Sequence, residues 1–301
     1  MVGLVRLLAA LTLSASSLVF SIPYRNLTQS LAPTAGGLCG VDQLALSLPK
    51  ADERLIASNA QTRALVDREI GVTWWVIYKD ETPAGGYLES SDINRAITQL
   101  NSHYANTGFK FVVYTISYEK NANWFDYASV TRLGDDETQA SKDMKEAIHA
   151  GTASYLNIYS VGMTNPESPG LLGYARFPEW YSTTPELDVV VFKGTTIPGG
   201  TQVNYDQGKV LTHEVGHWLG LYHTFAGGSC YGQGDKVADT RAESEPAYGC
   251  PVGRNSCPMY PGVDPIRNHM DYTYDACKTD PFTTGQITRM QASFTTYRDG
   301  K

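Results

Sequence analysis

Three histidines and one glutamate between residues 213 and 223 have the types and the spacing of a catalytic metal site. His213 and His217 are four positions apart, so on a helix they lie one turn apart and about 40° apart around its axis, and both imidazoles can reach one ion. Glu214 directly follows the first histidine. It can contact a water molecule on that ion without being a ligand.

His223 can supply a third nitrogen, provided that the helix ends before it. Six residues past His217, an unbroken helix would carry His223 roughly 240° around the axis and away from the ion. Gly220 can end the helix, because glycine enters left-handed backbone conformations without steric cost. Three neutral imidazoles with one open position describe a catalytic zinc site, whereas a structural site would close with four protein ligands.

This arrangement predicts hydrolysis. A zinc ion lowers the pKa of a bound water molecule from about 16 to near 7. We expect Glu214 to take the proton, to orient the water for attack on a carbonyl carbon, and to return the proton to the leaving amine. The short motif H-E-x-x-H also arises by chance, but the extended H-E-x-x-H-x-x-G-x-x-H is far more specific.

The extended motif resembles that of the metzincin clan of zinc endopeptidases, and the sequence that follows it is similar to the pappalysin family. The segments that carry this resemblance are residues 213–223, 234–240, 249–251, 268–272, 282–286 and 289–290. The resemblance implies a catalytic domain of the α/β (α+β) class. It would have a mixed, mostly parallel twisted sheet with helices in an upper lobe, and a smaller, loop-rich, disulfide-bonded lower lobe.

The resemblance also implies roles for three residues after the zinc motif. Met270 would form an apolar floor beneath the imidazoles, although a methionine alone is more often core filler. Tyr272 would stabilise the oxyanion of the tetrahedral intermediate, with a buried structural tyrosine as the alternative. Asp275 would line the pocket for the residue after the cleaved bond and favour Lys or Arg there; the alternative is a solvated loop carboxylate.

Composition and the N-terminus predict a secreted protein. The chain has 301 residues, a formal net charge of −7 and no basic run, which argues against nucleic acid or an anionic membrane as a partner. Residues 1–20, with Arg6 ahead of an apolar stretch, resemble a signal peptide that is too short to span a bilayer comfortably. Asn26 lies in the one plausible glycosylation acceptor, Asn26-Leu27-Thr28.

Residues 21–66 lack a core-sized apolar pattern, and we interpret them as a prosegment. Cys39 is the single cysteine in this stretch. The resemblance implies that Cys39 acts as a fourth zinc ligand, which would hold the protein as a latent zymogen. The alternative is a thiol that bonds to another molecule or stays reduced.

Residues 67–301 have the signals of one catalytic domain, with an upper lobe over residues 67–223. Strands at 72–79, 109–118, 155–161 and 188–192 alternate with helical patterns, which favours a largely parallel sheet. The residues expected in its core are Trp74, Trp75, Phe111, Tyr114, Ile158 and Val190. Residues 171–177 are expected to form an edge strand, either a plain connection or one on which an extended peptide pairs by main-chain hydrogen bonds.

The lower lobe, residues 224–301, contains the other four cysteines, and two disulfides would stabilise it by about 2–4 kcal/mol each. Four cysteines allow three pairings, and the sequence does not choose among them. The family pattern implies Cys230 with Cys257 and Cys250 with Cys277. Asp235 and Asp239, with Thr240, could bind calcium, although ordinary loop carboxylates explain them as well.

Together these observations predict a secreted zinc metalloendopeptidase that hydrolyses protein or peptide substrates bound extended in a cleft. Two alternatives stay open: a hydrolase that trims only particular peptides, and a secreted binding protein with a vestigial site. The second alternative predicts the loss of Glu214 or of a histidine ligand, and all four residues are present. Neither the oligomeric state nor the physiological substrate follows from the sequence.

Overall fold

A five-stranded sheet forms the framework of the computed structural model, which describes residues 38–40, 53–54, 56–57, 59–60, 65–130 and 137–301. The predicted signal peptide and Asn26 lie outside these residues. The strand order is β2-β1-β3-β5-β4, and β4 pairs antiparallel with β5 while the other pairs are parallel. The strands are β1 (Arg68–Tyr78), β2 (Phe109–Lys120), β3 (Leu156–Val161), β4 (Gly173–Ala175) and β5 (Val189–Lys193). The mixed, mostly parallel sheet that the resemblance implies is therefore confirmed.

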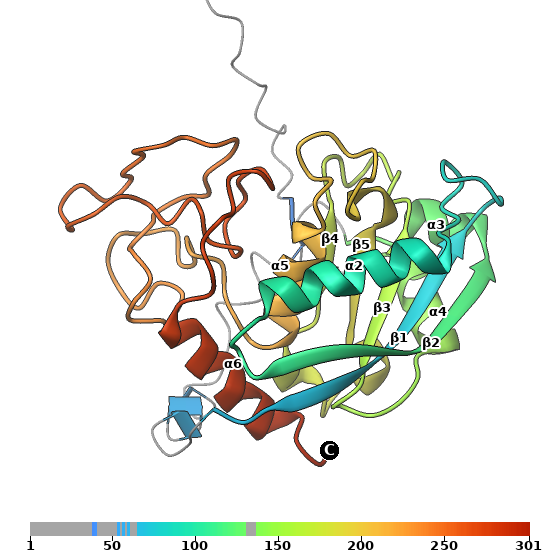
Figure 1. The fold of residues 1–301 in the computed structure, drawn as a ribbon, viewed down its shortest axis with the longest axis horizontal. Coiled ribbons are helices and arrows are strands. Elements are labelled where there is room, and N and C mark those ends of the chain that lie inside the picture. The colour runs from blue at the N-terminus through green and yellow to red at the C-terminus, as the bar shows by residue number, and fades with distance from the viewer. Residues whose placement is uncertain (1–37, 41–52, 55, 58, 61–64, 131–136) are drawn as a thin grey trace, which may run out of the picture. The chain divides into compact units, whose positions relative to one another are not determined.

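Helices cover both faces of this sheet (Figure 1). On one face lie α2 (Ser90–His103) and α5 (Lys209–Trp218), and on the other lie α3 (Ala122–Tyr127) and α4 (Gln139–Ile148). Successive strand residues point to opposite faces. Trp74 therefore packs with α2 and α5, whereas Trp75 contacts the cluster that contains α4. Two separate apolar cores result, and the first of them supports the histidine motif.

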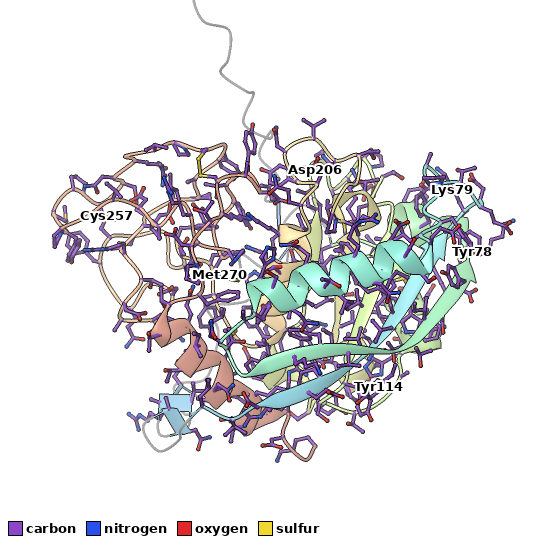
Figure 2. All side chains as sticks on the ribbon, in the orientation of Figure 1. Tyr78, Lys79, Tyr114, Asp206, Cys257 and Met270 are labelled. Carbon is purple, nitrogen blue, oxygen red and sulfur yellow. A yellow bond between two sulfur atoms is a disulfide. The ribbon has the colours of Figure 1, made fainter. Side chains whose placement is uncertain are left out.

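Two local features differ from the sequence-based expectation. Tyr114 is not a core residue, since it is 55% exposed. The register of β1 against β2 shifts between Val72 and Thr73, so Tyr114 is the extra residue of a β-bulge on an edge strand, and such a residue is turned out of the ladder. Figure 2 labels it on the β1–β2 pair. The short helix α3 was not expected, because its six residues are too few to give a clear period.

The antiparallel strand β4 occupies the edge of the sheet, as expected for residues 171–177. It lies next to α5, the helix that contains the first two histidines (Figure 1). The edge strand β4 and the start of the histidine motif are therefore neighbours in the fold.

The segment from residue 219 to residue 283 contains no helix or strand, and α6 (Thr284–Tyr297) follows it. Two disulfides close this segment: Cys230 with Cys257 and Cys250 with Cys277, the pairs that the family pattern implies. Figure 2 labels Cys257 in its outer loops. Only three residues, Ala247, Ile266 and Cys277, form a separate small core here, so covalent closure replaces much of the missing apolar burial.

A buried ion pair joins α6 to the sheet and to the end of α5. The guanidinium of Arg298 donates to both carboxylate oxygens of Asp188, at 2.6 and 2.8 Å, and to the carbonyl of Trp218 at 2.9 Å. The indole of Trp218 donates to the same carboxylate. Within the described part of the chain, none of the helices is long and apolar enough to cross a bilayer.

Candidate active site

The zinc-motif helix ends where the sequence requires it to end. Helix α5 stops at Trp218, and Gly220 has a φ of +93°. The amide of Gly220 donates to the carbonyl of His217, and the amide of Leu221 donates to that of Gly216, which is the Schellman pattern of helix termination. The chain then turns back, so that His223 reaches the face on which the other two histidines lie.

The three imidazoles converge on one point. The Nε2 atom of His213 lies 3.1 Å from that of His217 and 3.1 Å from that of His223, and the third separation is 3.0 Å. The Cys39 thiol joins them, since the four ligand atoms all lie within 4.8 Å of one another. No other group of three or more His, Cys, Asp or Glu side chains comes together in this way among the residues described.

Backbone carbonyls fix the orientation of two of these rings. The Nδ1–H of His213 donates to the carbonyl of His269, and the Nδ1–H of His217 donates to that of Leu221, each at 2.7 Å. A carbonyl can only accept, so the proton of each neutral ring is on Nδ1 and the lone pair of Nε2 faces the centre. Burial, together with the neighbouring imidazoles, lowers the pKa of His213 and His217 well below the ordinary value and keeps both rings neutral.

This donor set fits zinc. Two Nε2 lone pairs that point at each other across about 3 Å repel unless a cation lies between them. Nitrogen ligands placed 2.0–2.1 Å from one zinc ion in tetrahedral geometry would be about 3.3 Å apart, close to the separations found here. His213, His217 and His223 can therefore hold one zinc ion, and the Cys39 sulfur is near enough to be the fourth donor.

Met270 lies in the loop-rich segment, and Figure 2 labels it where that segment meets the helices. It is fully buried, and a Cβ on Gly216 would stand only 2.5 Å from its sulfur, so glycine is required between the two metal-motif histidines of α5. The turn that contains Met270 is linked to α6 by a pair of side-chain amides. Asn268 and Gln286 each donate a hydrogen bond to the other, at 2.9 and 3.0 Å.

Glu214 lies on α5, and its side chain is buried against the edge strand β4. A Cβ on Gly173 would approach the Glu214 carboxylate to 2.7 Å, so the absence of a side chain at Gly173 makes room for it. Its Oε2 accepts a hydrogen bond from the Cys39 thiol at 3.3 Å. Sequence reasoning did not single out Gly173; the signal was a glycine within the predicted edge strand, which marks a close approach.

Residues 38–40 occupy the edge of the sheet beside these side chains. The amide of Leu172 donates to the carbonyl of Leu38 at 2.8 Å, and the amide of Gly40 donates to the carbonyl of Gly173 at 3.1 Å. Cys39 forms a parallel bridge with Gly173. The hydroxyl of Tyr272 donates to the Cys39 carbonyl at 3.1 Å. A stretch of extended chain therefore already pairs with β4 next to the histidines.

A small cavity of about 20 Å³ adjoins Glu214 and the three-residue stretch 38–40. The residues that line it are Leu38, Cys39, Leu172, Tyr205, Val210, His213, Glu214, Tyr272 and Lys278. Asp275 is not among them. Its Oδ2 accepts instead from the backbone amides of Gln207 and Lys209 at the start of α5, and burial raises its pKa. The expectation that Asp275 selects Lys or Arg stays a prediction.

The acidic loop residues have separate surroundings. Asp239 caps the start of α6, since it accepts from the hydroxyl of Thr283 and from the amide of Gly285. Asp235 is buried and accepts from Thr240, and burial raises its pKa to about 7. Asp235 and Glu243 line a cavity of about 200 Å³, and no described residue donates a hydrogen bond to the second oxygen of Asp235.

Solved structures similar to this fold include those of mirolysin, a metzincin protease. A mutant of Tannerella forsythia promirolysin aligns with a TM-score of 0.67 at 27% identity, covering 86% of this chain and 94% of that one. Mature mirolysin in complex with a cleaved peptide aligns with a TM-score of 0.60 at 28% identity, covering 77% and 93%. The fold and the site thus define a metzincin metallopeptidase.

Sequence comparison identifies the family. The sequence model of peptidase family M43, described as pregnancy-associated plasma protein-A, matches residues 138–295. An extracellular metalloprotease of Colletotrichum graminicola is 42% identical over 246 residues, covering 81% of this chain and 82% of the relative. One of Pyricularia oryzae is 37% identical over 271 residues, covering 87% and 90%. The chain belongs to the pappalysin family of metzincins and is a zinc metallopeptidase.

Proposed function

We propose that this chain is a secreted endopeptidase that cleaves extended segments of protein substrates, with His213, His217 and His223 as the zinc ligands and Glu214 as the proton-transferring residue. The convergence of three Nε2 atoms beside one buried carboxylate carries this proposal. Secretion is supported by the predicted signal peptide and by relatives that are named extracellular metalloproteases.

With zinc bound, the site gains a Lewis acid that polarises a substrate carbonyl and acidifies a water molecule. Glu214 accepts the proton of the attacking water and passes it to the nitrogen of the leaving amine. Because Gly173 has no side chain, the Glu214 carboxylate can lie directly beside the edge strand, where the scissile bond would lie. In the structure the carboxylate is buried, and the Cys39 thiol donates to its Oε2 atom.

Tyr272 is proposed to assist the carbonyl oxygen as negative charge develops on it. Its hydroxyl donates to the carbonyl of Cys39, which shows that it can reach a peptide carbonyl held on β4. Hydroxyl donors placed at a developing oxyanion typically contribute 10²–10³-fold to kcat. Met270 supports the imidazoles through packing alone.

The substrate is proposed to pair with β4 as residues 38–40 do. Main-chain hydrogen bonds on an edge strand hold an extended peptide without regard to most of its side chains. This supports cleavage within proteins. A hydrolase restricted to particular peptides would be distinguished by cleaving those peptides while leaving casein intact.

Residues 21–66 are proposed to be a prosegment that keeps the enzyme latent. The Cys39 thiol lies among the histidine ligand atoms and is not part of the Cys230–Cys257 or Cys250–Cys277 disulfide. It also donates a hydrogen bond to Glu214, so it contacts both the metal site and the proton-transferring residue. The paired stretch around Cys39 also covers the edge strand that a substrate needs. Residues 67–301 would then be the mature catalytic domain, with lobes at 67–223 and 224–301.

The central test combines metal analysis with casein hydrolysis by purified active enzyme. We expect one zinc ion per chain and loss of hydrolysis with a chelator. Glu214→Ala should abolish hydrolysis while retaining zinc, because Glu214 is not a ligand. Glu119→Ala, on the far edge strand β2, is the matched control and should be fully active. Full activity of Glu214→Ala would refute the mechanism.

A further inference from the structure

Arg289, Lys236 and Tyr222 together form a carboxylate-binding site, which Glu53 fills in the structure. The two terminal nitrogens of Arg289 each lie 3.0 Å from a different oxygen of Glu53. The Lys236 ammonium lies 2.8 Å from the same carboxylate, and the Tyr222 hydroxyl donates to it at 3.3 Å. Glu53 belongs to the proposed prosegment, so this site loses its occupant when residues 21–66 are removed.

The carboxylate-binding site is held in shape by contacts that do not involve Glu53. The Nε–H of Arg289 donates to the carbonyl of Gly220 at 2.8 Å, and the guanidinium lies 4.6 Å from the centre of the Tyr222 ring. The Lys236 ammonium lies 5.0 Å from the centre of the same ring. The aromatic face attracts both cations, which would otherwise repel each other. The donors are therefore oriented before a new carboxylate arrives, which lowers the cost of binding.

The backbone of Lys236 supports a role for its side chain. Its φ is +61°, in the left-handed region that residues with a side chain rarely adopt. Glycine or asparagine would adopt this conformation more readily. A lysine at such a position, with its ammonium on a carboxylate, indicates that the charge is used.

Two carboxylates of the catalytic domain lie near enough to act on Arg289 through space. They are Glu179 and Asp235, and neither forms an ion pair with Arg289 in the part of the chain that the structure describes. Within that same part, the one carboxylate paired with Lys236 is Glu53. Removal of Glu53 therefore leaves the Lys236 ammonium without its partner.

The prosegment residues on this face of α6 show what kind of segment fits it. The described residues between 53 and 60 have helical backbone. Glu53, Ile56 and Asn59 are spaced by three, so they lie on one side of that helical segment. Ile56 is buried, and the Asn59 amide donates to the hydroxyl of Thr296 at 2.8 Å. Thr296 lies about two helical turns beyond Arg289 on α6, so the contact follows the helix.

We propose that this face of α6, with the carboxylate-binding site at one end, binds substrate outside the catalytic cleft in the mature enzyme. Its partner is an amphipathic helical segment of a protein substrate, with Glu or Asp three residues ahead of an aliphatic residue. The inference rests on the proposed function, since the prosegment must leave first. None of the residues that line the cavity beside Glu214 takes part, so the cleft stays free for the segment that is cut.

The first test measures binding of a fluorescent synthetic peptide with the sequence of residues 51–62 to mature enzyme processed from the full chain. We expect saturable binding, with Glu53→Gln in the peptide weakening it about tenfold, because the hydrogen bonds to a charged group are lost. Asp52→Asn, which removes the same charge from the neighbouring residue, is the matched control and should bind like the unchanged peptide. Mass spectrometry shows that the peptide stays intact.

Three results of this measurement would overturn the proposal. They are no binding, equal binding of the Glu53→Gln peptide, and displacement of the peptide by an equal concentration of acetate, which would make the site one for small free carboxylates. Active enzyme whose N-terminal sequence still includes Glu53 would overturn it as well. Casein hydrolysis by the same preparation reports the endopeptidase function separately, so its failure is distinguishable.

Lys236→Asn tests the site from the enzyme side. Asparagine suits the left-handed backbone, so Tm without peptide should not fall, whereas peptide affinity should fall about tenfold. The losses from Lys236→Asn and from Glu53→Gln in the peptide should not add, because both remove the same contact. Lys110→Asn, at an exposed residue on the opposite edge strand, makes the same change in net charge and should bind normally. Unchanged affinity in Lys236→Asn would contradict the assignment.

A kinetic measurement decides whether the site serves catalysis. A fluorogenic peptide joined through a flexible linker to residues 51–62 should have a KM about tenfold lower than the same peptide alone, with kcat unchanged, because the second contact raises its effective concentration. The advantage should disappear with Lys236→Asn enzyme. Equal KM for the two substrates would refute a role in substrate binding.

Discussion

Glu53, within the proposed prosegment, and Arg289, on α6, form a two-pronged ion pair with both nitrogen–oxygen distances at 3.0 Å. Lys236 lies 2.8 Å from the same carboxylate, and the Tyr222 hydroxyl donates to it at 3.3 Å. Burial alone would raise the pKa of Glu53, but the hydrogen bonds and charges of Arg289 and Lys236 lower it from 4.5 to about 2. The Glu53 side chain is therefore held by contacts that do not involve Cys39.

Acid and Glu53→Gln should both loosen this anchor. A carboxyl whose pKa is lowered in the bound state stabilises that state above its free pKa, about 4.5, and loses this contribution as the pH falls toward 2. Hydrogen bonds to charged groups contribute about 1.5 kcal/mol, so Glu53→Gln should raise the activity of the intact precursor roughly tenfold at pH 7. Glu245→Gln, which removes an exposed partner of Arg254, is the control. Equal activity of the two precursors in a peptide assay would contradict a role for Glu53 in latency.

Cys39→Ser should also activate the precursor, and by a larger factor. Serine keeps the size of the side chain but is a much poorer zinc ligand than a thiolate. The main-chain bonds of Leu38 and Gly40 to the edge strand remain, so we expect partial activity rather than that of the processed enzyme. The measurement is peptide hydrolysis by unprocessed Cys39→Ser protein, with N-terminal sequencing to show that residues 21–66 are intact. A precursor as inactive as the wild type would rule out the thiol as the blocking group.

Tyr272→Phe should lower kcat by about 10²-fold and leave the zinc content unchanged, because it removes one donor to the developing oxyanion. KM should change much less, since ground-state binding depends mainly on the edge strand. Tyr118→Phe removes a hydroxyl that donates to the carbonyl of Leu88, far along the sheet, and should be neutral. A loss confined to KM would indicate that Tyr272 binds substrate without stabilising the transition state.

Calcium should stabilise the loop-rich segment if Asp235 and Glu243 bind it. A ligand at 100 times its dissociation constant adds about 2.7 kcal/mol, which corresponds to a rise of roughly 5–10 °C in Tm for a domain of this size. Asp235→Asn should abolish the rise, whereas Asp239→Asn should retain it because Asp239 caps α6. Calorimetry of purified enzyme with and without calcium measures both. An unchanged wild-type Tm would leave these carboxylates with a purely structural role.

The parts of the site that could be predicted from sequence are those set by local spacing. The break at Gly220 follows from the angle between His217 and His223, and the turn that returns His223 is found as expected. The disulfide pairs follow from the family pattern, because spacing alone left three pairings open. Family resemblance thus supplied what local geometry could not.

Other features depend on contacts between distant residues, and no local pattern encodes them. Glu53 and Arg289 are 236 positions apart, and Arg298 and Asp188 are 110 apart. Lys278 looked like an ordinary loop lysine until the fold buried it beside Glu214. Tyr114 is an aromatic residue in a predicted strand, which favours a core position, but the bulge that turns it outward depends on the register against β1.

Gly216 packs so closely against Met270 that Gly216→Ala should destabilise the protein, although helix propensity alone predicts that it would stabilise it. Gly→Ala within a helix usually stabilises by about 1 kcal/mol. At Gly216 the added Cβ would stand 2.5 Å from the Met270 sulfur, so the floor beneath the imidazoles must shift, and overpacking of this kind costs about 1–3 kcal/mol. Gly216→Ala should therefore lower both Tm and zinc affinity. Gly194→Ala, where the nearest atom would be 3.7 Å from the new Cβ, is the matched control and should have little effect. A Gly216→Ala protein with raised Tm and normal zinc binding would show that Met270 does not constrain the helix.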